Sequence, residues 1–310
     1  MNLRLRLFTL LCALVFISAQ LQAQIFPGTP RTVFSTALNE RFTASEVYQI
    51  DVDAFNAWIK DHPDFSQSEL QLGKHQWKLE LVPSGIMQDY TLQVLTPDGL
   101  EVSKPANIAF KGTETNTGAH VRLTVSENFI AGMVLNGDET WYIEPYRYYD
   151  SNAAEDLFVV YERSAVRRDN INGSCLVLDE ENKAMEVLPF DQQETHEDEE
   201  GKSLACYQVE IAIASDKSMF TKYGSVSAVE SHNVAVLNDV QGNYVGWFNH
   251  DLNFVIVTQF VVTGNDPWSA SLDAGTVLSS FRTWGQAGNF NVVFDVASMW
   301  TNRDFSGGTI

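Results

Sequence analysis

The stretch YQVEIAIASDKSMFTKY, residues 207–223, decides how the C-terminal third of this chain of 310 residues folds. Its apolar run Val209–Ala214 predicts a strand. Ser227 with Glu230 three residues later matches a capping box and predicts the start of a helix soon afterwards. The apolar residues that then recur at helical spacing are Val226, Val229, Val236, Leu237, Val240 and Tyr244.

The pattern of strand and helix continues downstream. Phe254–Val262 is almost entirely apolar, which is typical of a strand buried on both faces. A second helix is expected to begin near Asp273 and to end at Gly285 and Gly288. A third strand is expected over Val292–Trp300. Such alternation favours a mostly parallel sheet covered by helices.

Residues 24–165 have a different, β-rich character. Short apolar or alternating runs between turn signals predict strands at Trp77–Val82, Tyr90–Leu95, His120–Val125 and Trp141–Ile143. Asn136-Gly137 lies between two such runs and predicts a tight hairpin. One short helix is expected around Asp53–Lys60. We therefore expect an antiparallel, sandwich-like region, and an α+β protein as a whole.

The N-terminus has the features of a secretory signal. Arg4 and Arg6 precede the apolar run Leu7–Ile17, and small and polar residues follow up to Ala23, where we expect cleavage. We therefore expect a secreted, extracellular product without a membrane anchor after signal cleavage. The 20 basic and 40 acidic residues give a formal charge of −20, which argues against nucleic acid as a partner. The charge could attract Ca²⁺ or simply maintain solubility.

An acidic segment separates the two regions. Residues 191–202 are half acidic and show neither helical nor strand periodicity, which indicates an exposed linker. The predicted order is a signal at 1–23, a β-rich region at 24–190, a linker at 191–205 and a second domain at 206–310. Arg167-Arg168 is a dibasic pair that is either a processing site or a solvated turn.

Three passages resemble the reprolysin (adamalysin-type) zinc peptidases of the metzincin class. They are residues 207–223, the helical Val236-Leu-Asn-Asp-Val240, and Phe294-Asp-Val-Ala-Ser-Met-Trp-Thr301 running through Asp304-Phe-Ser-Gly-Gly-Thr-Ile310. Upstream, His120–Val125, Ile130–Met133, Trp141–Pro145 and Val159–Tyr161 are similar to the propeptide of the same family. The resemblance implies a propeptide followed by the N-terminal half of a metzincin-like catalytic domain.

The resemblance also implies a Zn²⁺ endopeptidase that acts on protein or peptide substrates. The family binds zinc through His-Glu-x-x-His-x-x-Gly-x-x-His, and residues 1–310 contain no His-Glu pair. We therefore expect the N-terminal portion of a zymogen that is inactive by itself, with its zinc ligands and general base beyond Ile310. The alternative is a secreted, non-enzymatic binding or inhibitory protein of propeptide type.

Three further features are implied as sites. Cys175 is a candidate zymogen switch, whose thiolate would occupy the open coordination position of the zinc. The alternative is that Cys175 forms a disulfide, for example with Cys206. Glu210 and Asp295 match family positions at a structural Ca²⁺ site, or else they are ordinary hydrogen-bonded carboxylates at strand ends. The residues expected to begin the edge strand that binds an extended substrate are Gly308, Thr309 and Ile310.

Overall fold

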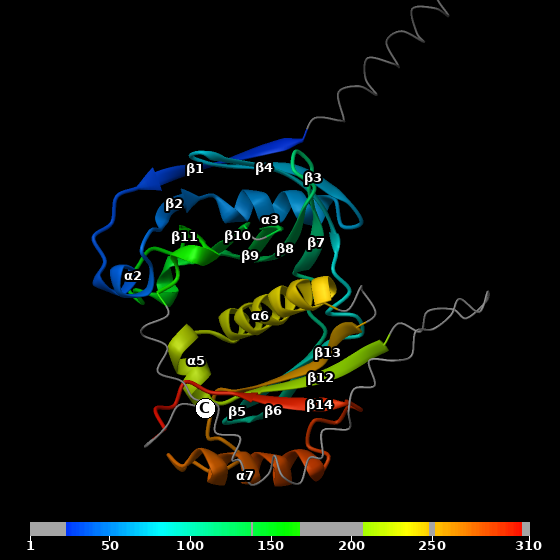
Figure 1. The fold of residues 1–310 in the computed structure, drawn as a ribbon. Coiled ribbons are helices and arrows are strands. Elements are labelled where there is room, and N and C mark those ends of the chain that lie inside the picture. The colour runs from blue at the N-terminus through cyan, green and yellow to red at the C-terminus, as the bar shows by residue number, and fades with distance from the viewer. Residues whose placement is uncertain (1–22, 138, 168–206, 248–251, 306–310) are drawn as a thin grey trace, which may run out of the picture. The chain divides into compact units, whose positions relative to one another are not determined.

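The computed structural model describes residues 23–137, 139–167, 207–247 and 252–305. Contacts within the chain divide it into two compact units, shown in Figure 1. The barrel unit comprises the chain up to Ser84 together with Ala109–Ala165. The sheet unit comprises Gly85–Ile108 together with the chain from Val166 onward. The expected linker at 191–205 lies outside the described residues, so that domain boundary stays a prediction.

Nine strands form the closed sheet of the barrel unit. In chain order they are β1 (Gln24–Arg31), β2 (Glu46–Ile50), β3 (Ser66–Leu72), β4 (His75–Pro83), β7 (Ala109–Glu114), β8 (Ala119–Ser126), β9 (Phe129–Asn136), β10 (Glu139–Pro145) and β11 (Leu157–Glu162). Neighbouring strands are antiparallel except for β1 and β3, whose parallel pairing closes the barrel. The sandwich expected from the sequence is therefore a barrel, because β1 pairs along both of its edges.

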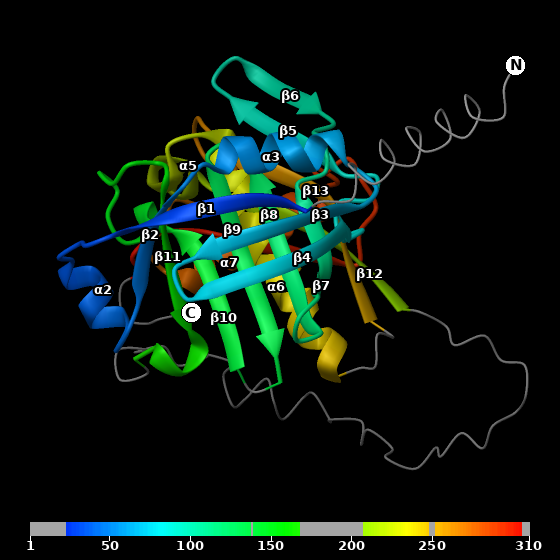
Figure 2. The same ribbon diagram turned by 90° about the horizontal axis from the view of Figure 1, so that it is seen from above.

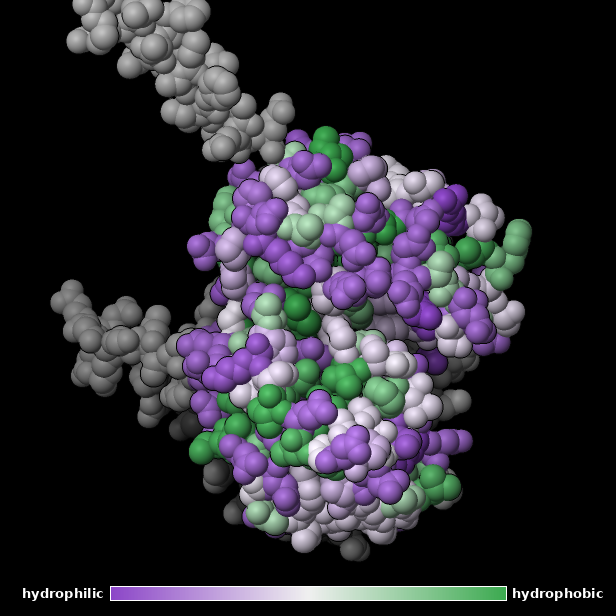
Figure 3. Space-filling view, turned by 180° about the vertical axis from the view of Figure 1, so that it is seen from behind, coloured by the Kyte–Doolittle hydropathy of each residue, from purple (hydrophilic) through white to green (hydrophobic). Residues whose placement is uncertain are grey.

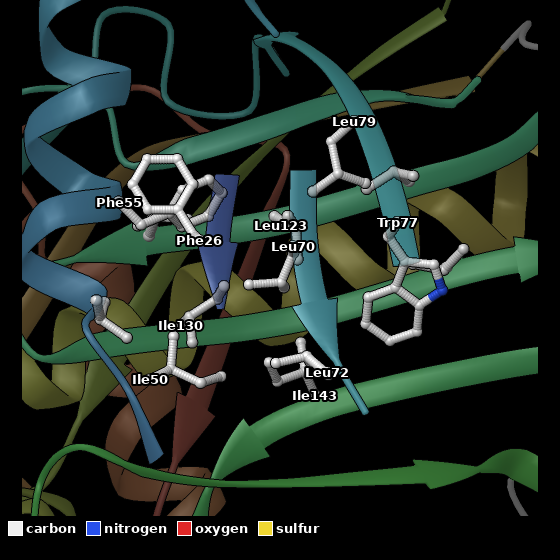
Figure 4. Close-up of a cluster of buried hydrophobic side chains, with 14 of the residues drawn as sticks. Phe26, Ile50, Phe55, Leu70, Leu72, Trp77, Leu79, Leu123, Ile130 and Ile143 are labelled. Atoms are coloured by element: carbon white, nitrogen blue, oxygen red, sulfur yellow. The ribbon is translucent and has the colours of Figure 1, made fainter. Parts of the chain in front are cut away.

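The core of the barrel unit is made of aliphatic and aromatic side chains. In β3 every second residue is buried, as expected for a strand with one face toward a core. The helix α3 (Val52–Asp61) confirms the expected helix and contributes Phe55 and Ile59 to this core. The ring centroids of Phe26 and Phe55 are 4.9 Å apart, edge to face, as Figure 4 shows. Among its described residues this unit also has the helix α2 (Thr36–Arg41) and two short 3-10 helices, Tyr146–Tyr148 and Arg163–Ala165.

The hairpin expected at Asn136-Gly137 is confirmed. Strands β9 and β10 pair antiparallel, with Asn136 opposite Glu139. Gly137 has a φ of 60°, a left-handed conformation that glycine adopts without the steric cost of a side chain. The local turn chemistry thus fixes the register of these two strands.

The sheet unit is built around five strands in the order β14-β12-β13-β5-β6. They are β5 (Thr91–Thr96), β6 (Gly99–Ser103), β12 (Tyr207–Ser215), β13 (Leu252–Val262) and β14 (Val296–Trp300). Strands β12, β13, β14 and β5 are parallel, and only β6 is antiparallel to its neighbour. The expected mostly parallel sheet is therefore present.

In the part of this unit that the structure describes, three helices accompany the sheet, namely α5 (Lys217–Tyr223), α6 (Val226–Trp247) and α7 (Ala274–Gln286). Figure 1 shows α6 and α7 on opposite faces of the sheet. Asp273 caps α7 through Thr276 N, which confirms the expected helix start. At the start of α6 the Ser225 hydroxyl accepts from Ala228 N, so Ser225 is the cap where the sequence suggested Ser227.

The strand expected at Tyr90–Leu95 does not belong to the barrel. It is β5, and the hairpin β5–β6 leaves the barrel unit after Ser84 and returns at Ala109. Figure 2 shows the two strands of this hairpin as neighbouring ribbons, labelled β5 and β6. β5 pairs with β13, whose residues lie far along the chain.

Within the described residues, no helix has the length and apolar character needed to cross a bilayer. Apolar side chains nevertheless reach the surface, and Figure 3 shows them in green between polar residues on one face. In the sheet unit the exposed large apolar residues include Leu100, Val102, Leu272, Leu278, Val293 and Val296.

Candidate functional site

The carboxyl ends of three parallel strands meet at one edge of the sheet unit and carry a buried ionic cluster. Asp216 follows β12, Asp266 follows β13, and Arg303 follows β14. Arg303 Nε lies 2.8 Å from Asp216 Oδ2, and an Arg303 terminal nitrogen lies 2.7 Å from Asp266 Oδ2. Open α/β sheets bind their ligands at this edge, so the cluster lies where a functional site is expected.

The cluster is internally satisfied. Asp216 Oδ1 accepts hydrogen bonds from Ser218 N and Met219 N, so Asp216 caps α5. Its other oxygen accepts from the Thr301 hydroxyl at 2.7 Å. Arg303 also donates to Ser269 O at 2.7 Å. With its charges paired and hydrogen-bonded, the cluster anchors the chain that leaves β14 at this edge of the sheet.

A buried polar layer lies between α6 and the sheet. The Asn233 amide donates to Ser215 Oγ at 2.8 Å and to Gln259 Oε1 at 2.9 Å, and all three residues are fully buried. Gln241 holds the start of β13 by donating to Leu252 O at 2.9 Å and accepting from Phe254 N. These bonds fix the register of α6 on β12 and β13, because each buried polar atom needs its partner.

Glu230 is a buried titratable group in this layer. Burial raises the pKa of Glu230 to about 7, and the nearby Tyr90 hydroxyl opposes this rise. Neither Tyr90 Oη nor Glu230 Oε1 makes a hydrogen bond of ordinary geometry. The same burial raises the pKa of Tyr90 well above its usual value. Tyr90 and Glu230 thus lie close together where the segment before β5 packs near α6.

The described histidines do not form a metal centre. His232 is partly buried, stacked on the Tyr223 ring at 4.5 Å and edge-on to Trp300. Burial, with a contribution from Lys222, lowers the pKa of His232 to about 4. His75 is buried between Trp77 and Trp141 in the barrel unit. Of the described histidines, His62 and His120 are exposed.

The two calcium candidates do lie together. Asp295 Oδ2 accepts from Glu210 N at 2.8 Å, and Asp295 N donates to Glu210 O at 2.9 Å. Asp295 is exposed and Glu210 is half-buried. One oxygen of Asp295 therefore already serves the backbone at the strand end. Among the described residues, no group of three or more His, Cys, Asp or Glu side chains could hold a metal ion.

The other predicted site residues lie outside the described residues. They are the switch candidate Cys175 and the edge-strand residues Gly308, Thr309 and Ile310. The cluster of Asp216, Asp266 and Arg303 was missed from the sequence. A signal was present, because a polar residue follows each of three parallel strands and such strand ends share one edge of a sheet.

Comparisons with known proteins give a distant similarity. No family model matches the sequence. A zinc metalloproteinase-disintegrin-like protein of Cerberus rynchops is 23% identical over 231 residues, covering 72% of this chain and 36% of that protein. The chain thus spans about a third of that relative. The crystal structure of metalloproteinase-II from Bacteroides fragilis matches with a TM-score of 0.34 and 11% identity, covering 74% of this chain and 63% of that one.

Proposed function

We propose that this chain is the N-terminal portion of a secreted, zinc-dependent endopeptidase zymogen of the reprolysin type. The observation that carries the proposal is the similarity to a zinc metalloproteinase over 231 residues. This aligned length exceeds the length of the sheet unit, so the similarity also extends into the barrel unit. The mostly parallel sheet with helices on both faces is consistent with it. The barrel unit would then belong to the propeptide.

The residues present do not fit a catalytic zinc. Residues 1–310 lack the His-Glu-x-x-His-x-x-Gly-x-x-His pattern, and the described residues hold no cluster of metal-ligating side chains. No reaction step is therefore assigned to this chain. What its residues can do is structural, because Arg303 and Asp216 anchor the segment that leads to Gly308, where the substrate strand is expected.

The first experiment measures zinc content and cleavage of casein by the purified chain. We expect less than one zinc per chain and no cleavage, because three protein ligands and an open position are needed. Casein cleavage that a chelator abolishes would overturn the inactivity. Reading the coding sequence past Ile310 tests the family itself. A zinc motif is expected within about fifty residues, from the ordinary size of a domain, and an immediate stop codon contradicts the proposal.

The role of Cys175 is tested in the longer parent protein. If its thiolate blocks zinc, Cys175→Ala releases activity in the uncleaved zymogen, since water then takes the open position. If it forms a disulfide, the same change lowers stability by about 2–4 kcal/mol without releasing activity. Cys206→Ala serves as the comparison, because it reproduces the loss only when the two cysteines are bonded to each other.

A second candidate is a non-enzymatic protein that binds a partner through its β-rich region. The closed barrel favours it, because this unit has a hydrophobic core of its own. A stop codon directly after Ile310, together with binding of the barrel unit to an unrelated secreted peptidase, would support this candidate over the zymogen.

A further inference from the structure

The segment Gly85–Ile108 is an excursion that the barrel does not require. Strands β4 and β7 are already paired antiparallel up to Pro83 opposite Phe110. Ser84 N also donates to Ala109 O at 3.0 Å. Two strand ends this close can be joined by a tight turn. The residues between them therefore serve a purpose outside the barrel.

The backbone of this excursion is bound to β13 beyond the ladder itself. β5 runs parallel to β13 from Thr91 opposite Thr258 to Leu95 opposite Val262. Additional hydrogen bonds close both ends of this pairing, from Ile256 N to Ile86 O at 2.7 Å and from Thr263 N to Leu95 O at 3.0 Å. The segment therefore contributes β5 to the sheet of the sheet unit.

Side chains lock the register of this pairing. Gln93 is 2% exposed and donates to Thr258 Oγ1 at 3.0 Å and to Phe290 O at 2.5 Å. The Thr258 hydroxyl in turn donates to Thr91 O at 3.1 Å. A slip by one residue would leave these polar groups buried without partners, which is costly. The apolar residues of the excursion that are buried are Ile86, Met87, Tyr90 and Leu92.

We propose that the β5–β6 hairpin is a strand-addition tether. If the chain is cut between Arg167 and Tyr207, the N-terminal piece contains the barrel strands and this hairpin, and the C-terminal piece contains β13. The pairing of β5 with β13 then holds the two pieces together without a covalent link. The recognised partner is the edge of β13, and the mode is addition of an extended strand to a sheet edge. The inference goes beyond the proposed function and needs no peptidase activity, because it rests on the pairing of β5 with β13.

The experiment cuts the complete chain and asks whether the two pieces stay together. A site-specific protease sequence replaces residues 197–200, and the cut protein is analysed by gel filtration and native mass spectrometry. We expect a single species that contains both pieces. In a second variant Asn-Gly replaces residues 85–108, and we expect its two pieces to separate, with an affinity at least a hundredfold lower. Co-elution of the pieces from this second variant would overturn the proposal, as would separation of the first.

Point variants keep the test decisive if the excision impairs folding. Gln93→Lys places a charge at a buried position of the tether, and Val102→Lys makes the same change at a β6 position that is 63% exposed. We expect at least tenfold weaker association of the cut pieces for Gln93→Lys and no change for Val102→Lys. Hydrogen exchange of the β13 amides should accelerate only in Gln93→Lys. Equal behaviour of the two variants contradicts the tether.

Discussion

The two units differ in how the edges of their sheets are paired. In the barrel unit each of the nine strands is paired on both sides. Among the described strands of the sheet unit, β6 and β14 lie at the two edges, and Val102 and Val296 are exposed on them. An unpaired edge is a site where another strand can add. The closed unit is thus complete in its pairing, whereas the open unit takes two of its strands from a distant part of the chain.

The interiors differ in the same direction. The barrel core is a continuous cluster of side chains such as Phe55, Leu70 and Phe158. The open unit has an apolar core that includes Phe260 and Phe281, and it also buries the amides of Asn233 and Gln259 between α6 and its sheet. Hydrophobic burial tolerates small shifts, but a buried polar network is stable only when its members are aligned. The open unit therefore depends more strongly on exact register.

The largest expected effect comes from producing the two units separately. Residues 206–310 alone lack β5, and β13 then has a bare edge next to uncovered apolar surface. We expect aggregation without a cooperative thermal transition. Residues 23–166 with Asn-Gly in place of 85–108 keep all nine barrel strands, and we expect a cooperative transition. Calorimetry on both proteins decides the matter, and a sharp transition of 206–310 alone would remove the contrast between the units.

A smaller effect separates buried from exposed ion pairs. Arg303→Ala leaves the fully buried Asp216 without its cation, and we expect a loss of about 3–5 kcal/mol of unfolding free energy. Arg147→Ala breaks an exposed pair with Glu155 in the barrel unit and should cost about 0–1 kcal/mol. Urea unfolding of both variants provides the comparison. Similar losses for the two would mean that the cluster at the sheet edge is no anchor.

The smallest effect is a pH dependence confined to the sheet unit. The folded pKa of Glu230, about 7, lies above its ordinary value of 4.5, so the folded state binds the proton more tightly. Its contribution to stability is fully present below pH 4.5, falls between pH 4.5 and about 7, and is lost above that. The slope is at most about 1.4 kcal/mol per pH unit.

Glu230→Gln removes this slope, whereas Glu127→Gln, at an exposed position, retains it. Urea titrations at pH 5, 6, 7 and 8 measure the difference in unfolding free energy between each variant and the wild type. A difference that stays constant across this range for Glu230→Gln would mean that its pKa is ordinary in the folded protein.

Local features of the fold could be predicted from the sequence. Asn136-Gly137 marks the hairpin between β9 and β10, where Gly137 has a positive φ, and the apolar run at Phe254–Val262 requires a strand buried on both sides. Asp273 similarly caps α7 through a residue three positions away. Each of these signals lies within one element or one turn.

Features that depend on distant pairing could not be predicted. The closure of the barrel rests on β1 beside β3, and the assignment of Thr91–Thr96 rests on β13. Neither pairing leaves a mark in the strand's own residues. The candidate site shows the same limit, because Glu210 and Asp295 were found from a resemblance, while the pairing of Arg303 with Asp216 and Asp266 exists only once β12, β13 and β14 are aligned.

The pairing of Thr91 with Thr258 also sets an order of events during synthesis. These residues are 167 positions apart. At 5–20 residues per second a ribosome needs on the order of ten to thirty seconds to make that length of chain. Throughout this interval Tyr90 and Leu92, buried in the finished protein, have no β13 to cover them. The nascent chain thus carries a hairpin with uncovered apolar residues until its last third has been translated. During this time chaperones or neighbouring chains must cover these residues.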